Sequence, residues 1–234
     1  MIKVTIIVPA HNEEDTIIPL LEAVNNSVKR LPLIESEIIV VNDGSTDRTG
    51  ILIKNNPDLY DLEINNTING GKGSAVISAL KQATGEFVLF QDADLEYDPL
   101  DYQILVKPIL EFDADIVIGS RFLAPQWTRV HYFWNKVGNR LITLTFNVLN
   151  NTTFTDIYSC YILYRRSLIN VQELRYHSWQ QQAEILTLAV LKGRVFYDVP
   201  ISYQGRTYQE GKKIKCRHIL SIFWALFLTR LRRS

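Results

Sequence analysis

Four acidic residues at alternate positions form a candidate metal-binding segment in this sequence. Asp92, Asp94, Glu96 and Asp98 directly follow the apolar residues 87–90. Alternate side chains of an extended backbone point the same way, so the carboxylates of Asp92 and Asp94 can converge on one ligand. Two carboxylates suit Mg²⁺ or Mn²⁺ shared with the phosphates of a substrate. A solvated acidic turn is the alternative, and the position at the end of an apolar strand favours the metal site.

The other two acids of this segment have different expected roles. Asp98 precedes Pro99, which suits the first turn of a helix, so Asp98 is interpreted as a helix N-cap. Glu96 is a third candidate ligand for the metal.

Three other apolar segments also end in polar residues. The strand-like residues 4–8, 37–41 and 115–118 lead into PAHNE, NDGS and GSR. Because ligands of open α/β sheets bind beyond the carboxyl ends of the strands, these ends indicate one shared site. Asp43 in NDGS is a candidate for contact with a base or ribose, and turn formation is the alternative explanation for this composition.

A glycine-rich segment, NGGKGSA at residues 69–75, is similar to a phosphate loop but departs from the P-loop pattern. Asn66 stands at the first glycine position, and Gly73 follows Lys72 where Ser or Thr is required. We therefore expect the segment to open a helix, with Lys72 or backbone amides near the ligand.

A later basic segment, YQGRTYQEGKKIK at residues 203–215, has the composition of an anion-binding loop. Arg206 and Lys212 could clamp a diphosphate, and a solvated basic loop is the alternative.

These residues require a sheet that brings the strand ends together. Short apolar runs alternate with helical patterns up to about residue 118, which predicts βαβ units and a mostly parallel sheet with helices on both faces. The expected strands are residues 4–8, 37–41, 59–64, 86–90 and 115–118, and the expected helices are residues 12–28, 45–55, 73–83 and 100–111.

The pattern changes after Gly119. Residues 127–149 are rich in aromatic, apolar and basic side chains and predict one long helix or two. The remaining expected elements are strands at residues 158–164 and 194–199 and helices at residues 181–191 and from about residue 218.

Composition restricts the class of protein. The 234 residues are 47% apolar, which suits one large domain or one domain with a tail. Zero net charge argues against a protein whose whole surface binds nucleic acid, so no nucleic-acid partner is expected. Two cysteines do not form a disulfide framework, which favours a reducing compartment. Cys160 lies in an apolar strand and is expected to pack in the core.

The C-terminal segment combines aromatic and basic residues. Residues 206–233 contain eight lysines and arginines against the single Glu210. Residues 219–231 are apolar and include Phe223, Trp224 and Phe227, a composition that suits a helix on a bilayer with anionic headgroups. A helix packed on the core or on another subunit is the alternative.

The apolar segments also bear on location. No basic-then-apolar signal sequence precedes the first strand, and residues 219–228 are too short to span a bilayer, which takes ~20 residues. We therefore expect a cytoplasmic protein that is peripheral on the cytoplasmic face of the membrane.

Together these motifs resemble family 2 glycosyltransferases with a GT-A fold, and more closely their polyprenol-phosphate (dolichyl-phosphate) mannosyl or glucosyl synthase branch. The resemblance covers nearly the whole chain, in order, through IIVPAHNEE, VVNDGSTD, NGGKGSAV, DADLEYDP, GSRF, Thr155-Asp156, Glu184 and VPISYQGRTYQEGKKI. It implies a Rossmann-like GT-A domain over residues 1–215, with a nucleotide-sugar half at 1–120 and an acceptor half with a closing loop at 121–215. A tail helix at 216–234 follows.

The resemblance also implies roles for individual residues. The donor pocket is expected to contain Pro9, His11, Glu13, Val41, Asp43, Lys72, Asp92, Ala93, Arg206 and Lys212. The metal is expected at Asp92, Asp94 and Glu96, although relatives often have Gln at the last position. The acceptor phosphate is expected at Arg121, His131 and Asn135, and the catalytic residues are expected to be Asp94, Arg121, Asp156 and Glu184.

The implied reaction is inverting transfer of a hexose from a nucleotide sugar of the GDP-mannose or UDP-glucose type to polyprenyl or dolichyl phosphate. Such a phosphate is already anionic near neutral pH because its second pKa is ~6, so a strong base is not required. Electrostatic stabilisation of the leaving diphosphate is the main expected work of the protein.

Two other functions stay open. A transferase of the same fold could act on a glycan or protein, with Asp156 or Glu184 as base, and a nucleotide-sugar-binding partner would have no turnover. A homo-oligomer and a small membrane partner protein are open alternatives for the assembly.

Overall fold

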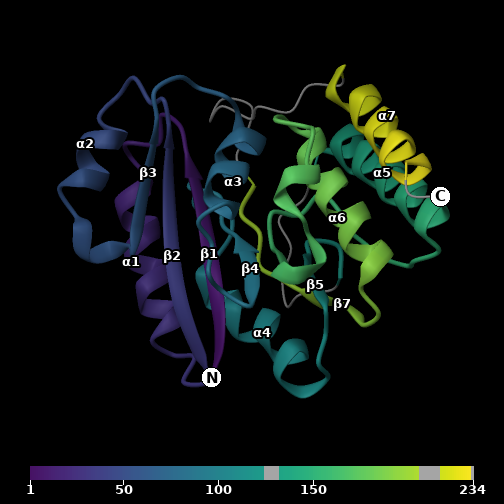
Figure 1. The fold of residues 1–234 in the computed structure, drawn as a ribbon, viewed down its shortest axis with the longest axis horizontal. Coiled ribbons are helices and arrows are strands. Elements are labelled where there is room, and N and C mark those ends of the chain that lie inside the picture. Colours follow the sequence, from purple (N-terminus) through teal and green to yellow (C-terminus); the bar gives the residue numbers. More distant parts are fainter. Residues whose placement is uncertain (124–131, 206–216, 233–234) are drawn as a thin grey trace.

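The computed structural model describes residues 1–123, 132–205 and 217–232, without the side chains of 217–219. Within these residues one sheet contains seven strands in the order β3-β2-β1-β4-β6-β5-β7 (Figure 1). The strands are β1 (Ile2–Ala10), β2 (Ile34–Asp43), β3 (Leu62–Asn66), β4 (Phe87–Phe90), β5 (Ile116–Ser120), β6 (Ile162–Arg165) and β7 (Phe196–Pro200). All neighbouring pairs are parallel except those of β6, which runs antiparallel to β4 and β5. The predicted mostly parallel α/β sheet is confirmed.

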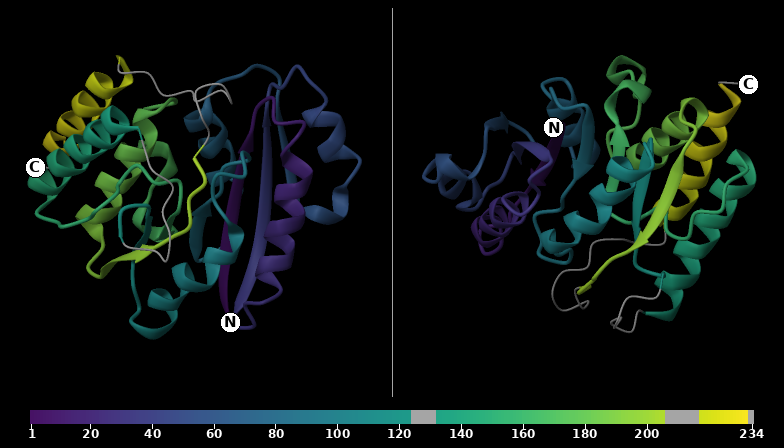
Figure 2. Two further views of the ribbon diagram at one scale, coloured as in Figure 1. Left: turned by 180° about the vertical axis from the view of Figure 1, so that it is seen from behind. Right: turned by 90° about the horizontal axis from the view of Figure 1, so that it is seen from below.

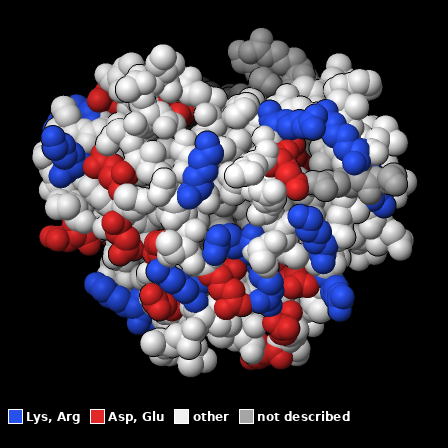
Figure 3. Space-filling view, in the orientation of Figure 1, with Lys and Arg blue, Asp and Glu red and all other residues white. Residues whose placement is uncertain are grey.

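Helices cover the sheet on both faces (Figure 2). They are α1 (Ile17–Val28), α2 (Thr49–Lys54), α3 (Lys72–Leu80), α4 (Tyr102–Glu111), α5 (Phe133–Asn150), α6 (Gln180–Lys192) and α7 (Arg217–Leu231). None of the helices in the described parts of the chain is long and apolar enough to cross a membrane. Charges of both signs are interspersed on the face drawn in Figure 3, in keeping with the zero net charge.

Two helices begin later than the sequence pattern predicts. The expected start of α1 at Asn12 is wrong because Asn12 has a φ of 53° and its side chain accepts a hydrogen bond from the backbone N–H of Thr46 at 2.8 Å. The expected start of α2 at Ser45 is also wrong. Asp47 accepts from the N–H of Thr49 at 2.9 Å, and the helix starts only after this local turn. Both segments are held as a loop pair at the ends of β1 and β2.

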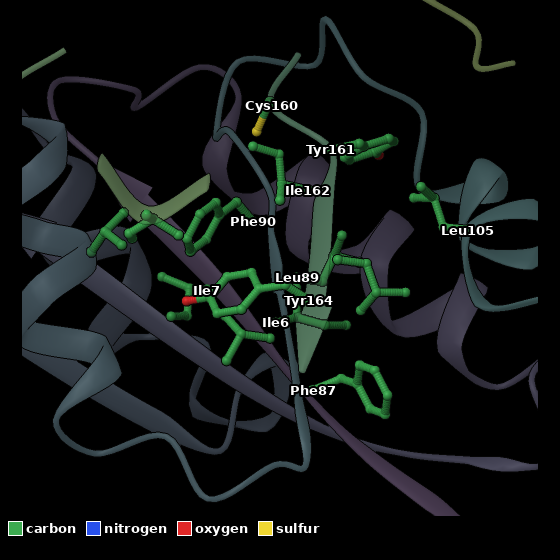
Figure 4. Packing of buried hydrophobic residues seen from close by; sticks show 14 of the residues in the cluster. Ile6, Ile7, Phe87, Leu89, Phe90, Leu105, Cys160, Tyr161, Ile162 and Tyr164 are labelled. Atoms are coloured by element: carbon green, nitrogen blue, oxygen red, sulfur yellow. The ribbon is translucent and has the colours of Figure 1, made fainter. Parts of the chain in front are cut away.

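The hydrophobic core is centred on the middle strands of the sheet, and these strands fix the positions of the polar segments that follow them. All four residues of β4 are buried, and the side chains of Phe87, Leu89 and Phe90 lie near those of Ile6, Ile7 and Tyr164 in Figure 4. Burying one such large apolar side chain stabilises the fold by ~1.5–3 kcal/mol. The polar residues after Phe90 therefore leave the sheet at a fixed point.

Candidate active site

A pocket of about 270 Å³ lies beyond the carboxyl ends of β1, β2 and β4. Its lining includes many of the residues that the sequence predicts for the donor site: Pro9, His11, Glu13, Asp43, Lys72, Asp92, Ala93 and Asp94. It also includes Asn69, Gly71, Ser178 and Trp179, for which the sequence pattern indicates no individual role. Three of the four strand ends expected to converge therefore line this pocket, whereas the fourth, after β5, does not, because Ser120 and Arg121 lie outside the lining.

Asp43 organises one side of this pocket. Its buried carboxylate accepts hydrogen bonds from the amide of Asn66 at 2.8 Å and from the backbone N–H groups of Gly70 at 3.2 Å and Gly71 at 2.8 Å. Gly71 has a φ of +85°, a conformation that glycine adopts readily. Asp43 thus both lines the pocket and shapes the glycine-rich segment that leads into α3, a contact that the local turn interpretation did not include.

His11 is held in one tautomer by two neighbours. Its Nε2 accepts from the amide of Asn69 at 2.8 Å, and its Nδ1 lies 2.9 Å from the carbonyl oxygen of Asp43. The carbonyl oxygen of Asp43 can only accept, and Oδ1 of Asn69 accepts from the N–H of Gly71 at 2.8 Å, so the N–H₂ of Asn69 faces His11 and this network places the ring proton on Nδ1. The sequence places Asn69 at the start of the glycine-rich segment NGGKGSA but gives no sign of its contact with His11.

Lys72 faces the acid pair from the first turn of α3. Its Nζ lies 2.5 Å from Oδ1 of Asp92 and 4.0 Å from the sulfur of Cys160. Burial alone would lower the pKa of Lys72, but the negative charges led by Asp92 outweigh it and raise that pKa. Burial raises the pKa of the Cys160 thiol, so this cysteine is neutral at physiological pH. A fixed ammonium therefore stands beside the carboxylate pair.

The acid segment is a turn, not the extended strand that alternate spacing suggested. Leu95 has a φ of 56°, and the N–H of Glu96 donates to Asp94 at 3.2 Å. Left-handed backbone at a non-glycine residue is uncommon and clusters at functional sites. This turn separates Asp92 and Asp94, which line the pocket, from Glu96, which does not.

Glu96 contacts the segment that follows β7. The hydroxyl of Tyr203 donates to its carboxylate at 2.7 Å, and the N–H of Gln204 donates to its carbonyl at 2.9 Å. Within residues 1–123, 132–205 and 217–232 no group of three or more His, Cys, Asp or Glu is arranged to hold a metal ion. Asp92 and Asp94 supply the oxygen ligands that Mg²⁺ and Mn²⁺ prefer, and phosphates or water would have to complete the set.

Asp98 has a separate structural role. Its carboxylate accepts from the N–H of Leu100 at 2.9 Å, and Pro99 opens the short 3₁₀ turn that leads into α4. The predicted N-cap is confirmed.

Arg121, which is half-buried, and the buried Asp156 form an ion pair outside the pocket lining. The guanidinium donates to the two carboxylate oxygens at 2.7 and 2.8 Å, and Asp156 is fully buried. Asn139 of α5 donates to the same carboxylate at 3.0 Å, and the guanidinium lies over the ring of Tyr203 at 5.1 Å. Bidentate geometry of this kind orients both partners. Asp156 therefore positions Arg121.

Glu184 lies on α6 and faces a different cavity of about 400 Å³. Its buried carboxylate accepts from the N–H groups of Arg175 at 3.0 Å and Tyr176 at 3.1 Å. Burial raises the pKa of Glu184, and these N–H groups oppose the rise. The residue after Tyr176 is His177, whose backbone carbonyl accepts from the N–H of Ser74 at 3.1 Å, in the first turn of α3. Glu184 thus holds the backbone that precedes two pocket residues, Ser178 and Trp179.

The other predicted residues are placed as follows. Val41 is buried inside β2, and Asn135 lies in the first turn of α5, away from the pocket lining. His131, Arg206 and Lys212 lie outside the described residues. Trp179 lines the pocket and its carbonyl accepts from the hydroxyl of Tyr158 at 2.9 Å. An aromatic residue just before a predicted helix was the one sequence signal for it.

Comparison with known proteins gives a family match. Residues 5–171 match the family model described as glycosyl transferase family 2. The undecaprenyl-phosphate 4-deoxy-4-formamido-L-arabinose transferase of Proteus mirabilis is 28% identical over 215 residues, covering 90% of this chain and 62% of that protein. The protein of the same name from Yersinia pestis is 27% identical with the same coverage. The chain thus spans less than two thirds of the length of these relatives.

Solved structures share the fold. Glucosyl-3-phosphoglycerate synthase from Mycobacterium tuberculosis in complex with UDP has a TM-score of 0.66 and 20% identity, covering 99% of this chain and 80% of that one. Mannosyl-3-phosphoglycerate synthase from Rubrobacter xylanophilus has a TM-score of 0.68 and 18% identity, covering 99% and 74%. These likenesses support the GT-A architecture. With the match over residues 5–171, they confirm the resemblance drawn from the motifs: the chain belongs to glycosyl transferase family 2.

Proposed function

We propose that the chain transfers a hexose from a nucleotide sugar to the phosphate of a polyprenyl lipid, with inversion at the anomeric carbon. The observation that carries this proposal is the pocket at the strand ends, where Asp92, Asp94 and Lys72 lie at one side and Asp43 and His11 at the other. The named activity of the Proteus and Yersinia relatives, transfer to undecaprenyl phosphate, supports the lipid phosphate as acceptor.

Two kinds of protein group in the pocket suit the two parts of a nucleotide-sugar donor, the nucleoside and the diphosphate. His11, Asp43 and Asn69 offer a fixed set of donors and acceptors suited to a nucleoside. Lys72 offers a cation suited to the diphosphate. Structures of the Mycobacterium tuberculosis neighbour contain UDP, and a GDP-sugar is an equally open donor for this chain.

Asp92 and Asp94 would hold a Mg²⁺ or Mn²⁺ ion together with the donor diphosphate. When bound, such an ion stabilises the negative charge that develops on the leaving group. Lys72 lies beside the same carboxylates and supplies a positive charge from the protein itself.

The two acids expected beyond residue 120, Asp156 and Glu184, bear on the kind of acceptor because both are bonded to other protein groups. A phosphate oxygen attacks the anomeric carbon, the bond from that carbon to the diphosphate breaks, and the nucleoside diphosphate leaves with the electron pair. This attack needs no base, because the phosphate is anionic. A sugar hydroxyl would need one, yet Asp156 is paired with Arg121 and Glu184 accepts backbone N–H groups away from the pocket. Neither of the two acids expected to act as base for a hydroxyl lies in the pocket lining, which supports a phosphate acceptor.

The test is a transfer assay with several donors. Purified chain, Mn²⁺, a polyprenyl phosphate and either GDP-mannose or UDP-glucose are expected to give an organic-extractable glycolipid with one of the donors. Glycosylation of a glycan or protein, with none of the lipid phosphate, would overturn the acceptor. Titration with GDP and UDP in Mn²⁺ identifies the base, and equal turnover by Asp94→Asn would overturn the role of the acid pair.

A further inference from the structure

The two helices α5 and α7 pack side by side at the end of the molecule opposite β3 and α2 (Figures 1 and 2). Arg230 of α7 joins them by donating from Nε to the carbonyl of Leu149 at 3.0 Å. Each helix already buries an inward stripe, with Ile142 and Phe146 on α5 and Ile222 and Leu226 on α7. The contribution of both helices to the core is thus accounted for by these inward faces.

Both helices carry a second apolar stripe that faces solvent. On α7 the exposed side chains recur every three or four residues, at Leu220, Trp224, Phe227 and Leu231. On α5 they are Phe133, Trp134, Leu141, Leu144 and Val148. Trp134 is 76% exposed and Trp224 is 65% exposed. An amphipathic helix of a soluble domain places polar residues on this outer face, so two neighbouring apolar outer faces indicate a docking surface.

The charges on these helices have one sign. Neither α5 nor α7 contains an Asp or Glu, whereas Lys136, Arg140 and Arg230 lie on them. Two copies of the chain that met through this face would bring cations together. An anionic lipid surface complements both features, since tryptophan and phenylalanine suit the bilayer interface and lysine and arginine suit its headgroups.

We propose that the outer faces of α5 and α7 form one lipid-docking surface that binds an anionic bilayer. The sequence had pointed to the C-terminal helix alone, and the structure adds α5 as an equal part. The role of this surface in catalysis rests on the proposed function, because a membrane-bound chain meets a polyprenyl phosphate in the plane of the bilayer. Binding itself requires neither donor nor acceptor.

The docking surface is connected to the ion pair described above. Asn139 of α5 donates to Asp156, Asp156 holds Arg121, and the guanidinium of Arg121 lies over Tyr203. Glu96, next to the acid pair, accepts from Tyr203. A helix that lies on the bilayer is therefore joined by side chains to the segment that carries Asp92 and Asp94.

The experiment is sedimentation of the chain with vesicles of phosphatidylglycerol and phosphatidylcholine, compared with vesicles of phosphatidylcholine alone. We expect binding to the anionic vesicles that weakens with salt. Trp134→Ser/Leu144→Ser on α5 and Trp224→Ser/Phe227→Ser on α7 should each lower the partition coefficient by about tenfold or more. The matched control, Leu33→Ser/Ile51→Ser, removes two equally exposed apolar side chains far from these helices and should bind as the unsubstituted chain does.

Three results would overturn the proposal. The first is absence of binding to anionic vesicles. The second is loss of binding in the α7 pair with none in the α5 pair, which would leave α7 as the whole surface. The third is a dimer in sedimentation velocity that the same substitutions dissociate, without vesicle binding. Because donor and acceptor are absent from the assay, failure of the proposed transfer reaction would leave the vesicle result unchanged, and the reverse also holds.

Discussion

The carboxylates of the pocket and the carboxylates beyond residue 120 are used in opposite ways. Asp92 and Asp94 are part-exposed, line a pocket and face the ammonium of Lys72. Asp156 and Glu184 are buried and hold neighbouring protein groups. All of them fit an active-site motif by residue type and order in the chain. What separates a substrate-facing acid from a structural one is the partner that the fold supplies.

The largest expected effect tests the structural side of this comparison. Asp156→Asn leaves the largely enclosed guanidinium of Arg121, 14% exposed, without its charge partner, which should lower the free energy of unfolding by ~3 kcal/mol. Urea denaturation followed by circular dichroism measures it. Asp113→Asn is the matched control, because Asp113 pairs with Arg165 at 2.6 Å but its side chain is 90% exposed, so the loss should be at most ~1 kcal/mol. Equal losses in the two variants would contradict the structural assignment of Asp156.

The next effect tests the pocket side. Asp94→Asn should reduce kcat by ~10²–10³-fold with little change in unfolding, because it removes charge where the donor diphosphate is proposed to bind. Glu96→Gln is the comparison within the same segment. Gln still accepts from Tyr203, so its loss should stay below about tenfold. An equal loss in the two variants would return Glu96 to the metal ligands that the sequence predicted.

A third and smaller expected effect comes from comparing Lys72, in the pocket, with an exposed lysine outside it. Lys72→Met removes the ammonium beside Asp92, so the donor KM should rise by about tenfold while Mn²⁺ binds the freed acid pair more tightly. Kinetics and calorimetric titration with Mn²⁺ measure the two effects. Lys107→Met is the control, since Lys107 is exposed and pairs with Glu111 along α4. Unchanged Mn²⁺ affinity in Lys72→Met would argue that the ammonium and the metal occupy separate places.

Much of this architecture was predictable from local pattern. Apolar runs separated by helical segments gave the parallel sheet, and the polar residues after those runs gave the pocket, because strand ends in such sheets meet. The direction of β6 was not predictable, since a short apolar run reads the same in a parallel and an antiparallel strand. The left-handed turn at Leu95 was likewise hidden, because leucine carries no signal for positive φ.

The site was harder to predict where distant contacts decide a role. Glu184 accepts from Arg175 and Tyr176, which lie in the loop before α6. Asp156, in the segment before β6, accepts from Arg121, which follows the neighbouring strand β5. Neither partner can be predicted from spacing in the sequence. Asn69 and Trp179 reach the pocket only through the fold of their segments. Sequence pattern therefore located the strand ends correctly but could not divide their acids by function.

Asp101 offers a pH test of the division between exposed and engaged acids. Burial raises its pKa to about 6, against the hydrogen bond from the N–H of Ser202 at 2.7 Å. The folded protein thus holds this proton more tightly than the unfolded chain, whose value is near 3.8, so stability from this group is complete below that value and is lost as pH rises through about 6. Asp101→Asn keeps an acceptor for Ser202 and cannot titrate.

The measurement for Asp101 is urea denaturation between pH 4 and 7. Relative to the unsubstituted chain, Asp101→Asn should gain ~1 kcal/mol across this window, a value below the full shift because the side chain is partly exposed. A difference that stays flat with pH would show that Asp101 does not titrate there.

The smallest expected effect separates two acids four residues apart. Asp98→Ala removes the acceptor for the N–H of Leu100, which should cost ~1 kcal/mol of stability, and it should leave kcat unchanged because Asp98 lies outside the pocket lining. Asp98→Asn is the matched variant, since Asn is an equally good cap and should restore stability. Denaturation and turnover measured on the same samples give both readouts. If Asp98→Ala lost turnover as Asp94→Asn is expected to, the acids of this segment would act as one anionic site, and position within a turn would not be what divides them.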